Sequence, residues 1–179
     1  MRFLGLRLGR ELGFDEVDLG FEFNLNAIAR GPARRLYLGA EAGRIFRSDD
    51  DGASWRELPS PYDGSFYGIL PLDGDALLAF GLRGNLFRSE DGGMSWTAIP
   101  TGTLALLTSG ARVDASIVVI SGMAGVLLVS RDGGRSFTLT QQDNRKAISA
   151  VLPASDGELI LAGEGGVRRL PLPAEGATP

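Results

Sequence analysis

Three short segments carry the side chains whose types and spacing are best suited to chemistry. Segments 48–55, 89–96 and 130–137 share a serine, an aspartate, a glycine, a second serine and an aromatic residue at matching positions. Such a carboxylate could bind a metal ion, move a proton, or accept backbone hydrogen bonds in a turn. The matching aspartates are evenly spaced along the chain, one to a segment, and so form no cluster of acids. We therefore interpret them as turn residues.

Each position in these segments has a predicted structural role. The aspartates accept backbone N–H groups across the turn, and the glycines supply a positive φ. The aromatic residues begin the following strand, where they cover the hairpin or pack on the next repeat unit. The residues concerned are Asp50, Gly52, Trp55, Asp91, Gly93, Trp96, Asp132, Gly134 and Phe137. We predict no catalytic residue, no metal site and no cofactor.

The composition excludes further chemistry. The 179 residues include no cysteine and no histidine, which excludes disulfides, thiol nucleophiles, Ser-His-Asp triads and the common zinc sites. The net charge of −4 argues against a nucleic-acid partner, which usually needs a basic face. No apolar run approaches the ~20 residues of a membrane span. The first residues lack the apolar core of a secretory signal, and the compartment stays open because a cysteine-free chain suits oxidising and reducing surroundings alike.

The interval between the aspartates recurs well beyond the three segments. It also relates four glycines and two sets of four apolar residues: Gly43, Gly84, Gly125 and Gly166; Leu36, Leu77, Val118 and Leu159; Leu25, Phe66, Leu107 and Ile148. The chain therefore contains four copies of one unit, the last without its aspartate segment. Internal repeats of this length are typical of propeller blades.

Each unit contains short β-rich runs separated by turn residues. In the second unit the predicted strands are 65–72, 76–82, 85–90 and 95–100, and no stretch shows the apolar period of a helix. Four strands in ~40–45 residues make one propeller blade, which buries both faces of its middle strands by stacking on its neighbours. The predicted fold is all-β: a β-propeller or propeller fragment of about four blades, each of four antiparallel strands.

The repeats divide the chain into three parts. Residues 24–172 form the propeller region, 173–179 a tail, and 1–23 an N-terminal segment. The fourth unit has only three predicted strands, 147–154, 158–164 and 166–172. Its outer strand could come from the N-terminal segment, at 2–8 or 20–23, as a latch that covers an open edge.

Binding residues are expected where otherwise similar repeats differ. The loops between second and third strands lie on the rim opposite the aspartate segments, together with the links between blades. We place Glu41, Arg83, Met123 and Glu164 at equivalent positions of these loops, and Arg145 in the link 141–146. Arg47 and Arg88 recur in the third strand. They either recognise carboxylates of a partner or pair with neighbouring acids.

The motifs resemble the BNR or Asp-box repeat. The residues before them, Gly43 to Ser48 and Gly84 to Ser89, resemble the photosystem II stability/assembly factor family over about residues 24–172. This resemblance implies a seven-bladed, usually exported propeller that binds newly made membrane-protein subunits. Four units would then be part of a longer ring, although a four-bladed ring is also physically allowed.

The leading functional hypothesis is a noncatalytic propeller that binds a protein or peptide, with an assembly-factor or chaperone-type role. The partner could be a membrane-protein subunit. An alternative is a sialidase-like propeller that binds or cleaves glycans, for which two positioned carboxyls would be needed. A third hypothesis is self-association through open blade edges.

Overall fold

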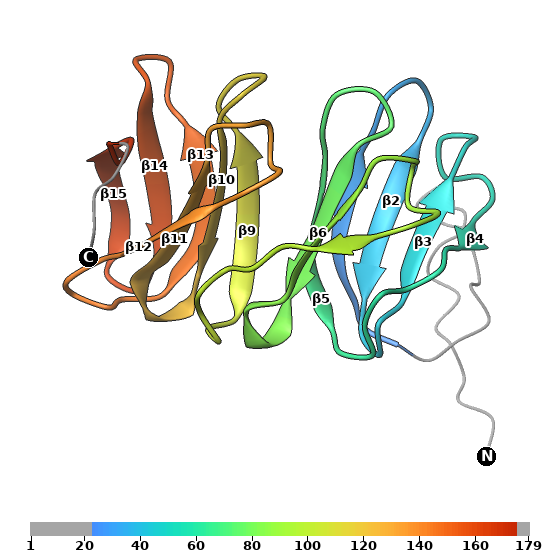
Figure 1. The fold of residues 1–179 in the computed structure, drawn as a ribbon, viewed down its shortest axis with the longest axis horizontal. Coiled ribbons are helices and arrows are strands. Elements are labelled where there is room, and N and C mark those ends of the chain that lie inside the picture. Colours follow the sequence, from blue (N-terminus) through green and yellow to red (C-terminus); the bar gives the residue numbers. More distant parts are fainter. Residues whose placement is uncertain (1–22, 175–179) are drawn as a thin grey trace, which may run out of the picture.

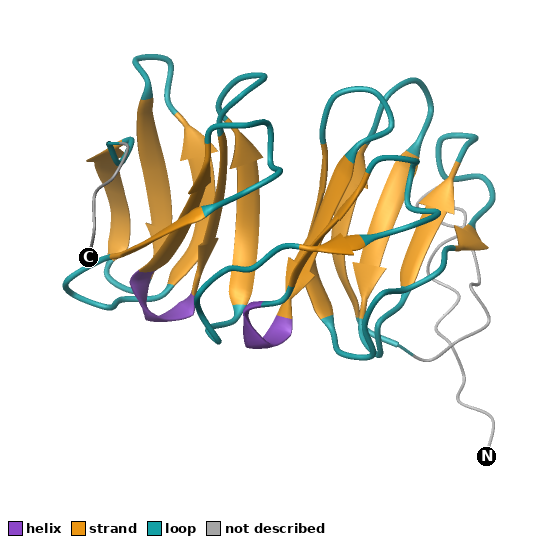
Figure 2. Cartoon of the chain, viewed as in Figure 1, coloured by secondary structure: helices purple, strands orange, loops and turns teal. Residues whose placement is uncertain are grey.

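The computed structural model describes residues 23–174 as four small sheets standing side by side (Figures 1 and 2). Within each sheet the strands are antiparallel and follow chain order. Blade 1 comprises β1 (Leu25–Arg30), β2 (Leu36–Ala40), β3 (Ile45–Ser48) and β4 (Arg56–Glu57). Blade 2 comprises β5 (Phe66–Pro71), β6 (Leu77–Gly81), β7 (Leu86–Ser89) and β8 (Thr97–Ala98). Blade 3 comprises β9 (Leu107–Arg112), β10 (Val118–Gly122), β11 (Val126–Ser130) and β12 (Thr138–Gln141), and blade 4 comprises β13 (Ile148–Pro153), β14 (Glu158–Gly163) and β15 (Gly166–Pro171).

This arrangement confirms the predicted all-β propeller architecture with its 41-residue repeat. The only helical elements in residues 23–174 are two single 3₁₀ turns, η1 (Leu82–Gly84) and η2 (Met123–Gly125), at the lower edge of Figure 2. The four sheets form an open arc, with blades 1 and 4 at opposite ends of the longest axis (Figure 1). The candidate latch in residues 1–23 lies, except for Phe23, outside the described residues.

The core lies between neighbouring blades. Between blades 1 and 2, Tyr37 and Ile45 pack against Phe66 and Phe87, and equivalent clusters separate blades 2 from 3 and 3 from 4. Every residue of the middle strands β6, β10 and β11 is buried. A blade therefore needs neighbours on both faces, as expected for stacked sheets. We call the face toward the preceding blade the N-side face and the other the C-side face.

The pairing register follows the sequence repeat in three blades and then shifts. The paired residues Leu38 and Phe46 recur as Ala79 with Phe87 and as Ile120 with Leu128. In blade 4 Leu161 pairs with Arg168, one residue earlier than the repeat predicts. The cause is a shorter turn, since only two residues separate the paired Gly163 and Gly166. The predicted equivalence of Gly166 with Gly43, Gly84 and Gly125 therefore fails, because Gly166 begins β15.

Candidate binding surfaces on the two rims

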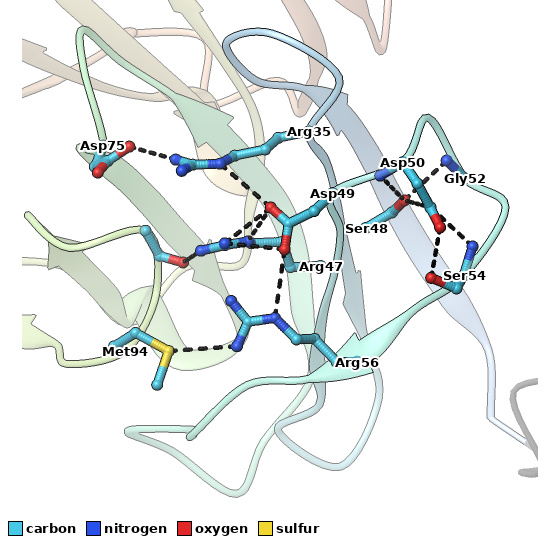
Figure 3. A network of polar contacts seen from close by, with 11 residues as sticks. Arg35, Arg47, Ser48, Asp49, Asp50, Gly52, Ser54, Arg56, Asp75 and Met94 are labelled. Carbon is cyan, nitrogen blue, oxygen red and sulfur yellow. Dashed lines mark hydrogen bonds and ion pairs between the residues drawn. The ribbon is translucent and has the colours of Figure 1, made fainter.

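The aspartate turns are closed hydrogen-bonded units. In the first (Figure 3), the Asp50 carboxylate accepts the Ser54 backbone N–H at 2.8 Å and the Ser54 hydroxyl at 2.6 Å. The Ser48 hydroxyl donates to Asp50 at 2.8 Å and accepts the Gly52 N–H at 2.8 Å. The same contacts recur around Asp91 and Asp132. Gly52, Gly93 and Gly134 have φ values of 96°, 90° and 84°, which suit glycine.

These hydrogen bonds hold the carboxylates in their ionised form. The hydroxyl and backbone N–H of Ser54 lower the pKa of Asp50 to about 2, and those of Ser95 lower the pKa of Asp91 to about 2. Burial opposes the shift at Asp132, yet the donors of Ser136 and Ser130 still lower its pKa. A carboxylate with so low a pKa holds no proton to donate at neutral pH. The geometry supports a structural role for the three aspartates.

The aromatic residues of the turns pack on the N-side face of their own blade, toward the preceding blade. Trp96 donates from Nε1 to the carbonyl oxygen of Pro59 in blade 1 at 3.0 Å. Phe137 packs against the cluster between blades 2 and 3. Trp55 donates to its own turn at Gly52, at 3.1 Å, and contacts the N-side cluster of blade 1. Of the two expected placements, Trp55 covers its own hairpin turn, whereas Trp96 and Phe137 pack toward the preceding blade and not the next one.

Arg47 and Arg88 bridge neighbouring blades. Arg47 Nη1 donates to the carbonyl oxygen of Gly92 at 3.2 Å, and Arg88 Nη1 donates to that of Gly133 at 2.7 Å. Each acceptor lies in the aspartate turn of the next blade. The Nε atoms bind Asp49 and Glu90, two residues further along the chain. Both side chains are thus engaged within the protein, and Arg88 is buried.

Other arginines near the aspartate turns are also paired with acids. The Asp49 carboxylate lies 2.8 Å from Arg47, 3.3 Å from Arg35 and 3.5 Å from Arg56 (Figure 3). The hydrogen bond from Arg47 is the largest cause that lowers the Asp49 pKa. Arg35 also reaches Asp75 in blade 2. Arg34 and Arg131 donate instead to the backbone carbonyls of Asp50 and Pro173. These arginines are thus engaged within the protein.

A small cavity of about 180 Å³ lies on this rim between blades 2 and 3. Its charged lining residues include Arg88, Glu90, Arg112 and Arg135. Arg112 is paired with Asp73 at 2.7 Å, and Glu90 accepts from Arg88 at 2.8 Å. Within residues 23–174 no group of three or more acidic side chains is placed to hold a metal ion.

The opposite rim carries cations without such partners. Arg83 occupies a tight turn with φ 57° and is exposed, and its side chain makes no hydrogen bond or ion pair within the described part of the chain. The same holds for the exposed side chain of Arg145, which has φ 49°. The structure corrects one alignment, since Arg83 matches Ala42 and Ala124, whereas Leu82 matches Glu41 and Met123.

Two exposed apolar residues, Leu104 and Met123, lie between Arg83 and Arg145 in the sequence and belong to the segments that cross the same rim. The link that contains Leu104 is tied to η1 by the Thr101 hydroxyl, which donates to Gly84 at 2.8 Å. It is tied to η2 by the Met123 N–H, which donates to Leu106 at 2.8 Å. Leu104 is 85% exposed and Met123 is also exposed. We call Arg83, Leu104, Met123 and Arg145 the rim patch.

Backbone contacts continue the rim patch to the next link. Gln142 donates its N–H to Gly125 at 2.9 Å, and Arg145 donates its N–H to Gln142 at 2.9 Å. The two acidic candidates are less available, because Glu41 accepts from the Asn24 amide at 2.9 Å and Glu164 from the Ala147 N–H at 3.3 Å. Leu104 was not predicted. The available signal was the apolar run 104–106 in a link that precedes a strand.

Comparison with known proteins identifies the fold. No family model matches the chain, and no curated protein matches it. YCF48 bound to D1 peptide superposes with a TM-score of 0.65 at 16% identity, over 87% of this chain and 52% of that one. The GH74 enzyme of Niastella koreensis gives 0.64 at 24% identity, over 82% and 28%. The computationally designed Ika4 protein gives 0.67 at 15%, over 87% and 95%. The chain thus spans about half of the YCF48 structure. At these identities the likeness establishes the propeller fold alone.

In residues 23–174 there is no helix with the length and apolar character of a membrane span.

Proposed function

We propose that this chain is a noncatalytic propeller module that binds a peptide segment of a partner protein on the rim patch. The single observation that supports this most strongly is the contrast between the rims. The arginines near the aspartate turns are engaged by acids or, like Arg34 and Arg131, by backbone carbonyls. Arg83 and Arg145 have no side-chain partner within the described residues. Unpaired cations beside exposed Leu104 and Met123 suit a segment with acidic and apolar residues.

The resemblance to the photosystem II assembly factors supports a peptide as the ligand class. The YCF48 structure with a D1 peptide is a neighbour of this fold. By extension we propose an assembly or chaperone-type role, in which the partner is a subunit of a membrane complex.

The carboxylates favour binding over catalysis. Glycoside hydrolysis needs one carboxyl that donates a proton and a second that acts as base or nucleophile. The aspartates of the turns have lowered pKa values and are saturated by donors of their own turn. Asp73 and Glu90, beside the cavity between blades 2 and 3, are paired with arginines.

Fluorescence anisotropy with a labelled peptide that alternates Glu and Leu tests the proposal. Peptides of the same length that alternate Lys with Leu, or Glu with Ser, serve as ligand controls. We expect binding of the Glu-Leu peptide alone, weakened by added salt and lost in the double variant Arg83→Glu, Arg145→Glu. Arg34→Glu, an exposed change on the opposite rim, should leave binding intact.

Two results would contradict the proposal. Equal affinity of the parent and the double variant would remove the rim patch as the binding surface. Turnover of an aryl glycoside or a fluorogenic sialoside above the buffer blank would remove the noncatalytic assignment and favour the glycan-active alternative.

A further inference from the structure

The C-side face of blade 4 is an apolar surface without a covering blade among residues 23–174. It carries Ala150, Leu152, Ile160, Ala162 and Val167, of which Leu152 is 62% and Val167 73% exposed. The residues that match Ile160 in the other blades are Tyr37, Leu78 and Val119, and all three are fully buried. This face therefore has the composition of an interior blade, and no blade covers it in the described part of the chain.

The N-side face of blade 1 has a matching exposed strip along β1. Leu25 is 49% and Ile28 67% exposed, whereas their counterparts in blade 2, Phe66 and Ile69, are buried against blade 1. On the same face Leu38, Ala40 and Phe46 are buried, with Trp55 packed on them. The exposed strip is one part of the surface that contacts the preceding blade in the later blades. Ala79 and Phe87, the counterparts of Leu38 and Phe46, also belong to the cluster between blades 1 and 2.

The register shift of β15 adds a directed polar contact. Arg169 pairs with Ile160, as Arg47 pairs with Tyr37 and Arg88 with Leu78. Arg169 thus occupies the strand position of the two bridging arginines, and its Nε binds Glu158 as theirs bind Asp49 and Glu90. Its Nη2 is paired with Asp156, so the donor that remains is Nη1, the atom that Arg47 and Arg88 direct to the next blade.

The aspartate turns complete this pattern. Arg47 and Arg88 bind the carbonyl groups of Gly92 and Gly133, and the matching residue in the first turn is Asp51. Asp51 shares their left-handed backbone, with φ 66° against 71° and 72°. Within residues 23–174 its carbonyl receives no arginine, because Arg30 binds the Asp51 carboxylate and Arg34 the carbonyl of Asp50. Val129 stands at the arginine position in blade 3, and blade 4 has no aspartate turn for an arginine to bind.

We infer that two copies of this chain associate head to tail, with the C-side face of blade 4 in one copy against the N-side face of blade 1 in the other. Arg169 then donates to the Asp51 carbonyl of the second copy. At the boundary between blades 1 and 2, a Cβ at Gly39 would lie 3.4 Å from the Cβ of Phe66 and 3.9 Å from the Cβ of Ile69. By the same register, Ala162 of one copy meets Leu25 and Ile28 of the other.

Two such junctions, related by a two-fold axis, close an eight-bladed ring, within the usual range of ~4–8 blades. The arrangement covers both end faces and supplies each first aspartate turn with an arginine from the preceding blade. It goes beyond the proposed peptide binding and does not depend on it, because the rim patch and the end faces share no residue.

Light scattering on the full chain gives the first test. We expect twice the chain mass of 18.9 kDa, and a dissociation constant that Arg169→Ala raises roughly ten-fold or more, as for a lost charge-assisted hydrogen bond. Leu152→Asp should yield monomers with the parent's far-ultraviolet circular dichroism. Leu104→Asp, an equally drastic change at an exposed leucine outside the end faces, should remain dimeric. A monomeric parent chain, or an Arg169→Ala variant that dimerises like the parent, would overturn the inference.

Disulfide trapping tests the orientation without relying on a destabilised variant, because the chain has no cysteine of its own. The expected separation of the Cβ atoms at Ile28 and Ala162 suits a disulfide. Under mild oxidation a mixture of Ile28→Cys and Ala162→Cys chains should form a covalent dimer that contains one chain of each. Neither variant should cross-link alone. Efficient cross-linking of Ala162→Cys to itself would show blade 4 against blade 4 and would refute the head-to-tail arrangement.

Discussion

Arg88 Nη1 lies 2.7 Å from the carbonyl oxygen of Gly133, 45 residues further along the chain. The arginine lies in the third strand of one blade and the glycine belongs to the aspartate turn of the next. Arg47 and Gly92 repeat this relationship one blade earlier, at 3.2 Å. The aspartate turns therefore close the hairpin of their own blade, and their carbonyl groups also accept a hydrogen bond from an arginine of the preceding blade.

Replacing Arg88 should loosen the boundary between blades 2 and 3. Because the guanidinium is buried and bonded to both Gly133 and Glu90, we expect Arg88→Met to lower the free energy of unfolding by about 2 kcal/mol. Chemical denaturation measures this loss. The matched control is Arg83→Met, an exposed arginine without a side-chain partner in the described residues, which should stay within ~0.5 kcal/mol of the parent. Equal stability of the two variants would contradict a bridging role.

The aspartate turns should make stability depend on acid pH. The folded pKa of Asp50 and Asp91 is about 2, below the ordinary value of 3.8, so the folded state favours the ionised form. Their contribution is complete above pH ~4 and is lost as the pH falls toward ~2. We expect the melting temperature to drop across this window. Asp91→Asn should lower the melting temperature at neutral pH and flatten the drop.

The control for this effect is Asp143→Asn, which removes an exposed carboxylate that makes no hydrogen bond within the described part of the chain. Its melting curve should follow the parent at every pH. An Asp91→Asn variant with the parent's full acid transition would show that the turn carboxylate does not contribute.

Much of the fold follows from the sequence because the repeat is regular where turns are made. Asp50, Asp91 and Asp132 are evenly spaced, each between two strands, and the structure places each in the predicted turn. In blades 1 to 3 the paired strands keep the same spacing, because a slip of one residue would move apolar side chains to the wrong face.

Contacts that cross between blades were harder to predict. Arg47 and Arg88 were recognised as recurring, yet their acceptors are backbone atoms 45 residues away, which leave no mark in the residue types. The shift of β15 depends on a turn shorter by one residue, whereas Gly166 still fits the repeat in sequence. The exposure of Leu104 depends on how its link crosses the rim.

The turn that positions Arg83 should depend on Gly84. A Cβ there would lie 2.0 Å from the Thr103 carbonyl oxygen, and φ is +69°. Gly74 has a similar φ of +62°, but a Cβ there would have no neighbouring atom within 4 Å. A substitution at Gly74 therefore measures the backbone strain without steric overlap. We expect Gly74→Ala to cost about 1–2 kcal/mol from the left-handed backbone alone. Gly84→Ala should cost at least ~1 kcal/mol more, because the link has to move.

Urea denaturation of the two variants measures this difference. Binding of the Glu-Leu peptide should weaken in Gly84→Ala alone, since only this variant displaces the rim patch. Equal costs for the two substitutions would show that the link next to Gly84 yields without strain.

The open edge of β15 should be covered by the segment that precedes β1. In blades 1 to 3 the outer strand of one blade leads into the first strand of the next, so we expect the residues before β1 at the outer-strand position of a preceding blade. Phe14 and Val17 stand one repeat before Trp55 and Leu58, which flank β4. Blades 1 and 4 lie at opposite ends of one copy (Figure 1), so in the head-to-tail pair this strand comes from the second copy.

Deleting residues 1–22 should then lower the melting temperature and increase aggregation, because an unpaired edge is a template for further pairing. Differential scanning calorimetry and light scattering measure both effects, with removal of residues 175–179 as the control truncation. A deletion variant that melts and associates like the parent would exclude the strand exchange.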